Sequence, residues 1–154
     1  MKTMFLLLFC LFSFCSIAQT SSVQSEAPFK KANTIIILTS DSADVALKKV
    51  GAAMVEKGYI IQKLDKEFHT LKTEAKSVRQ GAFPTTMTMR GVAVPGGVAL
   101  SAEIVADMRV ISATGERTRV RVISSGKEAT GYFKILQEVA SSYPGGQIRY
   151  TVRD

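Results

Sequence analysis

The sequence contains few of the side chains on which most enzymes and metal sites depend. Its 154 residues include one histidine, His69, and two cysteines, Cys10 and Cys15. Both cysteines lie in the apolar segment at the start of the chain, so removal of that segment leaves no thiol for a disulfide, a nucleophile or a metal site. The G-x-S-x-G, H-E-x-x-H and P-loop patterns are also missing. These absences argue against the commonest hydrolases and metalloenzymes.

The acidic residues do not form a recognisable catalytic pair. Two carboxylates can perform acid–base chemistry only where their environments separate the two pKa values. The candidates are instead scattered along expected strands and turns: Asp65, Glu67, Glu103, Asp107 and Glu116. We therefore expect no catalytic residue, no bound cofactor and no metal ion.

The first 18 residues have the features of a secretory signal peptide. Lys2 precedes an apolar run from Met4, and the small residues Ser16 and Ala18 suit signal peptidase. The run is shorter than the roughly 20 residues that a membrane-spanning helix needs. We expect cleavage after Ala18 and export to the periplasm or cell envelope of a bacterium. An uncleaved anchor and a lipid anchor at Cys15 are the alternatives.

The rest of the chain is basic and has the length of one domain. Residues 19–31 have few large apolar side chains and are expected to form a flexible leader, followed by a single domain over residues 32–154. Without Lys2, 19 basic residues stand against 13 acidic ones, a net charge of +6. In an exported protein this favours an unknown envelope protein, a lipid headgroup or an anionic polymer as partner, and no nucleic acid. Simple solubility is the alternative explanation.

Hydrophobic periodicity predicts the secondary structure. Apolar residues at helical spacing indicate one helix that begins after Asp41 or Ser42, either of which can cap it, and ends at Gly58. A second apolar stripe, which includes Tyr132, Phe133 and Tyr143, indicates another helix over residues 127–142. Strands are expected over residues 33–39, 59–64, 68–75, 86–94, 98–105, 117–124 and 147–154, with a loop over residues 77–86.

These elements predict an α+β fold. Their order is a strand, a helix, four or five antiparallel strands, a second helix and a last strand, or β-α-β-β-β-β-α-β in its shorter form. Two amphipathic helices and a one-sided sheet can bury their apolar surfaces only against each other. We therefore expect a two-layer sandwich in which both helices pack on one face of a mostly antiparallel sheet.

One segment resembles a known family. A helix ends at Gly58-Tyr59, a strand leads to a turn that contains Asp65, and Leu71-Lys72-Thr73 lies on the returning strand. This arrangement is similar to the repeated unit of the BamC lipoprotein of the β-barrel assembly machinery and related small envelope domains. The resemblance implies a helix-grip or TATA-binding-protein-like sandwich with a scaffold or binding role.

His69 lies in that hairpin and is interpreted as a turn residue. A catalytic triad needs a nucleophile, a base and an orienting carboxylate, and zinc needs several ligands, but the chain has no second histidine. In the hairpins of the BamC-like domains that this segment resembles, the residue four positions after the turn aspartate is often glycine. His69 occupies that position after Asp65. Histidine tolerates the left-handed backbone conformation better than most residues. The sequence therefore predicts a left-handed backbone at His69.

Alternating arginines provide the candidate binding site. Side chains alternate between the faces of a strand, so Arg117, Arg119 and Arg121 share one face, and Arg149 and Arg153 share one face of the last strand. If both strands belong to one sheet, its helix-free face carries a basic patch suited to phosphate or carboxylate groups. The alternative is a solvated outer face whose arginines pair with Glu103 or Glu116.

Two functions follow from these patterns. The first is an exported, noncatalytic binding or scaffold domain of the envelope that contacts an anionic partner through the arginine-bearing face. The second is a small-ligand carrier or enzyme that uses a cleft between helix and sheet. The second function requires polar groups in the core, whereas the expected inward-facing residues are mostly aliphatic.

Overall fold

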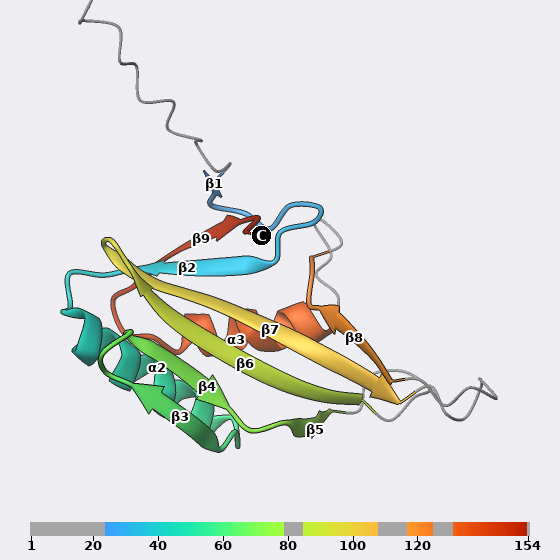
Figure 1. Ribbon diagram of the computed structural model, residues 1–154. Coiled ribbons are helices and arrows are strands. Elements are labelled where there is room, and N and C mark those ends of the chain that lie inside the picture. The colour runs from blue at the N-terminus through green and yellow to red at the C-terminus, as the bar shows by residue number, and fades with distance from the viewer. Residues whose placement is uncertain (1–23, 79–84, 108–116, 125–130, 154) are drawn as a thin grey trace, which may run out of the picture.

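The protein is an α+β sandwich in which one antiparallel sheet packs on two helices. The computed structural model describes residues 24–78, 85–107, 117–124 and 131–153. Within these ranges, nine strands form a single sheet whose main order is β1-β9-β2-β7-β6-β4-β3, with β5 paired to β6 and β8 paired to β7. Figure 1 shows α2 and α3 on the same face of this sheet. The opposite face is not covered by any described helix (Figure 1).

The strand bounds show how the chain builds this sheet. The strands are β1 (Gln24–Ser25), β2 (Thr34–Leu38), β3 (Ile61–Asp65), β4 (Thr70–Thr73), β5 (Lys76–Val78), β6 (Thr85–Val94), β7 (Gly97–Asp107), β8 (Arg117–Arg121) and β9 (Gln147–Thr151). The helices are α2 (Ala43–Glu56) and α3 (Gly131–Ser141). The long β6–β7 hairpin is central, because β4 and β5 pair with one side of it and β2 and β8 with the other.

Helix α2 ends in a Schellman motif at Gly58, the residue at which the sequence predicted the end of the helix. The Gly58 amide donates to the Val55 carbonyl and the Tyr59 amide donates to the Met54 carbonyl, while Gly58 has a φ of 76°. Glycine adopts this left-handed conformation without the steric cost that a Cβ would add. The Lys76 ammonium adds a further bond to the last turn by donating to the carbonyl of Lys57.

The start of α2 differs from the expectation. Ser42 occupies the position before the helix, but its side chain makes no capping hydrogen bond. The Asp41 carboxylate does not cap the helix either, because it accepts hydrogen bonds from Lys49 and Tyr143. The prediction of a side-chain cap from Asp41 or Ser42 was therefore wrong.

The core lies between the helices and one face of the sheet. Its largest fully buried side chains are Phe133, Ile35, Ile37, Leu47, Met54, Leu71, Met87, Met89, Leu100, Leu136, Val50 and Val98. Helix α2 approaches β4 closely at Gly51, where an added Cβ would lie 2.9 Å from Leu71 Cδ1. Apolar side chains thus fill the layer in which the alternative function required a polar cleft.

The fold class predicted from periodicity is confirmed, and two short strands were missed. Gln24–Ser25 lies in the expected leader but pairs with β9, and Lys76–Val78 overlaps the start of the expected loop but pairs with β6. Residues 1–18 and the start of the second predicted helix at 127–130 lie outside the described residues. In the part of the chain that is described, no helix is long and apolar enough to cross a membrane.

Candidate functional site

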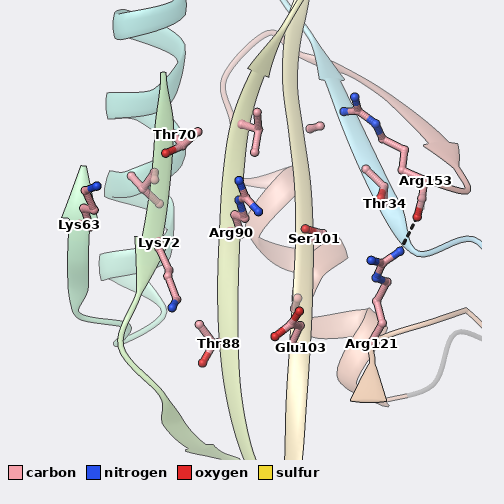
Figure 2. A pocket seen from close by; sticks show the side chains of 14 residues that line it. Thr34, Lys63, Thr70, Lys72, Thr88, Arg90, Ser101, Glu103, Arg121 and Arg153 are labelled. Carbon is pink, nitrogen blue, oxygen red and sulfur yellow. Dashed lines mark hydrogen bonds between the residues drawn. The ribbon is translucent and has the colours of Figure 1, made fainter. Parts of the chain in front are cut away.

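A basic groove runs along the face of the sheet that the helices leave open. It has a volume of about 530 Å³. Figure 2 shows its polar side chains rising from β3, β4, β6, β7 and the β2–β9 end of the sheet, with the helices behind. The residues that line it are Thr34, Lys63, Thr70, Leu71, Lys72, Thr88, Arg90, Val92, Ala99, Ser101, Ala102, Glu103, Arg121 and Arg153.

Strand pairing aligns three cationic residues in a lateral row. Lys63 on β3 lies opposite Lys72 on β4, and Lys72 lies opposite Arg90 on β6. Leu71 and Met89, which neighbour Lys72 and Arg90 in the sequence, are fully buried against the helices. Because side chains alternate along a strand, this burial directs Lys72 and Arg90 to the open face.

The charges in this row are only partly compensated. Lys63 Nζ lies 2.8 Å from Asp65 Oδ2. The Lys63 ammonium, followed by the Phe68 amide, lowers the pKa of the Asp65 carboxyl. Lys72 and Arg90 form no ion pair with any other residue in the described ranges. Like charges directly opposite each other destabilise a sheet, so this pair favours an external anion.

Hydrogen bonds to one asparagine fix the other end of the groove. Asn33 Nδ2 donates to the Arg153 carbonyl over 2.8 Å, and the Arg153 amide donates to Asn33 Oδ1 over 2.9 Å. The same carbonyl accepts a hydrogen bond from Arg121 Nη1, drawn as a dashed line in Figure 2. These contacts join β8 to the end of the chain after β9, so two predicted arginines meet at this end.

Glu103 is the one acidic residue among the described residues that line the groove. It lies on β7, directly opposite Arg121 on β8 and opposite Thr88 on β6. The register therefore gives one arginine of the predicted patch an acidic neighbour across the strands. The remaining cations of the groove outnumber this carboxylate.

The predicted arginines fall into three groups. Arg121 and Arg153 line the groove. Arg149 does not, and its Nη2 lies 3.0 Å from Glu26 Oε1. Arg117 and Arg119 lie on β8 opposite Asp107 and Val105, but their side chains are outside the described part of the structure.

Three cationic groove residues were not identified as a site from the sequence: Lys63, Lys72 and Arg90. The available signal was the alternation around each residue, as in Leu71-Lys72-Thr73, which assigns a face to the lysine. Alternation does not specify which strands pair or in which register. The cluster arises only because β4 pairs with β6, although β5 lies between these two strands in the sequence and also pairs with β6.

His69 is a turn residue, as predicted. Its φ is 45°, in the left-handed region. Asp65 Oδ1 accepts a hydrogen bond from the Phe68 amide over 3.0 Å, and His69 Nδ1 lies 3.3 Å from Asp44 Oδ1 on α2. Within the described ranges, no three His, Cys, Asp or Glu residues are close enough together to hold a metal ion.

A second polar cluster connects the helices away from the groove. Asp41 Oδ2 lies 2.6 Å from Lys49 Nζ and also accepts a hydrogen bond from the Tyr143 hydroxyl. The Lys49 hydrogen bond, then the Tyr143 hydrogen bond, lower the pKa of the Asp41 carboxyl. Burial, then the bond to Asp41, raises the pKa of Tyr143. The cluster joins the start of α2 to the end of α3 and has a structural role.

No protein-family model matches the chain, and no curated protein matches its sequence. The structural class of the protein is an α+β two-layer sandwich with a basic groove on the open face of its sheet. That groove combines flexible ammonium groups, planar guanidinium groups and hydroxyls. Such groups bind phosphate and carboxylate oxygens.

Proposed function

We propose that this protein is an exported, noncatalytic binding domain of the bacterial cell envelope. It binds an anionic partner on the open face of its sheet. The observation that carries the proposal is the row formed by Lys63, Lys72 and Arg90, in which the last two lack an ion pair among the described residues. A bound anion removes the repulsion between opposed cations, so binding also stabilises the sheet.

A binding role is favoured over catalysis by the composition of the groove. Its described lining contains lysines, arginines and hydroxyl residues, with Glu103 as the one carboxylate and no imidazole to act as a general base. The layer between the helices and the sheet is packed with apolar residues such as Leu47, Met54 and Phe133. This packing supports the binding domain over a carrier or enzyme that uses that layer.

Export rests on the sequence of residues 1–18, and the resemblance to BamC-like envelope domains agrees with it. A net charge of +6 after cleavage suits a compartment with anionic polymers and lipid headgroups. The groove gives this charge a specific location, because Lys63, Lys72, Arg90, Arg121 and Arg153 all line it.

Co-sedimentation with a bacterial envelope fraction tests the proposal. The wild-type protein should bind the fraction, and added salt should release it because the contacts are ionic. Lys72→Gln/Arg90→Gln should bind at least about tenfold more weakly, since two charge-assisted contacts are lost. Both residues are exposed, so this variant should keep the wild-type fold.

The matched control removes two charges from the other side of the molecule. Lys48 on α2 and Lys134 on α3 are also exposed, so Lys48→Gln/Lys134→Gln has the same net charge as the groove variant. The control should bind like the wild type. Equal weakening of both double variants would show that only net charge matters and would contradict a site on the open face.

A further inference from the structure

The distribution of the cations contains information about the shape of the ligand. The five cationic residues of the groove come from five different places in the sheet: Lys63 on β3, Lys72 on β4, Arg90 on β6, Arg121 on β8 and Arg153 after β9. Neighbouring strands are ~4.8 Å apart, so the four steps from β3 to β8 cover roughly 19 Å. A compact anion can contact two adjacent cations but cannot span this distance.

The small residues between the cations allow a chain to lie close to the sheet. Ser101 on β7 lies opposite Arg90 and continues the lateral row, and Ala99 and Val92 form an apolar pair beside it. Thr70 and Thr88 add hydroxyls to the lining. Phosphate groups are commonly bound by this mixture of lysine, arginine and hydroxyl side chains.

The described lining contains no aromatic side chain. Proteins that hold single-stranded nucleic acid combine a basic groove with aromatic side chains on which the bases stack. The groove thus has the groups that bind a phosphate backbone and lacks, in its described part, the groups that bind bases.

A flat membrane surface fits these observations less well than a chain. The cations line a groove of about 530 Å³ on the open face of the sheet. Headgroups held in a bilayer would have to enter that groove, whereas a flexible polymer can follow it.

We propose that the groove binds a linear phosphate polymer without bases, which lies across the strands from Lys63 toward Arg121 and Arg153. This inference rests on the proposed function and specifies the shape and chemistry of its ligand. Each phosphate contacts one or two cations, and the polymer gains affinity because several phosphates bind at once. Glu103, the one carboxylate in the described lining, opposes this binding.

Competition between phosphates of different lengths tests the inference. The protein is incubated with a labelled long-chain polyphosphate, and inorganic phosphate, tripolyphosphate and unlabelled long chains compete at equal concentrations of phosphate groups. The long chain should compete about 100-fold or more better than inorganic phosphate, as expected for linked contacts. Equal competition by inorganic phosphate would show a compact anion site and overturn the inference.

Variants assign the binding to the groove. Lys72→Gln/Arg90→Gln should lose at least about tenfold in affinity for the long chain, while Lys48→Gln/Lys134→Gln should not change it. Glu103→Gln should strengthen binding, because it removes the carboxylate from the described lining. Thermal unfolding of each variant establishes that the fold is intact. If the groove variants bind the long chain like the wild type, the inference is wrong.

Two further probes separate this inference from its alternatives and from the proposed function. Polyglutamate that binds as tightly as polyphosphate would overturn the phosphate assignment. A different result is that anionic phospholipid vesicles bind through Lys72 and Arg90 and polyphosphate does not bind. This result would overturn the inference of a linear polymer as ligand, but it would agree with the proposed function. Failure of phosphates, polyglutamate and vesicles alike would contradict the proposed function itself.

Discussion

Lys72 on β4 and Arg90 on β6 lie directly opposite each other on the open face of the sheet. Lys63 extends the row on β3, and among the described residues it is the only member of the row with a carboxylate partner, Asp65. A folded protein that places like charges opposite each other has a less stable sheet than one with a neutral pair. Such an arrangement is typical of a binding site, where the ligand supplies the missing charge.

The first prediction concerns stability without a ligand. Arg90→Gln should raise the free energy of unfolding by roughly 0.2–1 kcal/mol at low salt, because it removes a repulsive cross-strand pair. The gain should shrink at high salt, where the repulsion in the wild type is screened. Urea unfolding of both proteins at the two salt concentrations measures this difference, with Lys134→Gln as the control. A loss of stability in Arg90→Gln at low salt would contradict the repulsion.

The second prediction concerns acid stability. Hydrogen bonds from Lys49 and then Tyr143 hold the pKa of Asp41 below its ordinary value of 3.8. The stabilisation is therefore present above that ordinary value and is lost as the pH falls through the lower pKa of the folded state. Asp41→Asn should be less stable than the wild type near neutral pH, and the two proteins should converge in acid.

Urea unfolding at several pH values below about 6 checks this convergence. Glu56→Gln removes an exposed carboxylate from the same helix and serves as the charge control. Some acid sensitivity should persist in Asp41→Asn, because Lys63 and the Phe68 amide also lower the pKa of Asp65. Parallel pH profiles of Asp41→Asn and the wild type would contradict a role for Asp41.

The third prediction compares two adjacent glycines at the β6–β7 turn. An added Cβ at Gly97 would lie 2.1 Å from the Ile37 carbonyl oxygen, whereas one at Gly96 meets nothing within 4 Å. Gly96 has a φ of 75°, so Gly96→Ala should cost only about 1–2 kcal/mol of backbone strain. Gly97→Ala should cost more, because it forces β2 and β7 apart. Chemical denaturation ranks the two variants, and equal losses would contradict the close approach of β2.

The fourth prediction concerns His69. His69→Gly should be close to the wild type in stability and anion binding, because glycine suits the left-handed backbone and the lost contact with Asp44 is exposed. His69→Val should be less stable by about 1–2 kcal/mol, because a β-branched residue is strained in that conformation. A large loss of binding in His69→Gly at unchanged stability would restore a functional role for the imidazole.

The sequence was sufficient to predict the layers of the fold. The apolar stripe of α2, its stop at Gly58 and the turn at His69 are local patterns, and local patterns determine helix ends and turns. The two-layer sandwich follows, because amphipathic helices and a one-sided sheet must pack together. The short strands β1 and β5 were missed, since two or three residues carry no usable periodicity.

The site could be predicted only in part, for a physical reason. Alternation assigns Arg121 and Arg153 to the open face, and both line the groove. The meeting of Lys72 with Arg90 depends on strand register, which arises from packing and pairing across the whole sheet. Likewise, the two hydrogen bonds between Asn33 and Arg153 join residues 120 positions apart, and no local pattern indicates them.

The salt dependence of polyphosphate binding tests the central claim most directly. Affinity is measured over a series of salt concentrations for the wild type, Lys72→Gln/Arg90→Gln and Lys48→Gln/Lys134→Gln. Affinity falls as salt rises, and each lost phosphate contact should reduce the magnitude of the slope of log affinity against log salt by about one. The slope for the groove variant should therefore be smaller in magnitude than that of the wild type by about two, and the slope for the helix-face control should match the wild type. Identical slopes for all three proteins would contradict a phosphate-binding groove on the open face of the sheet.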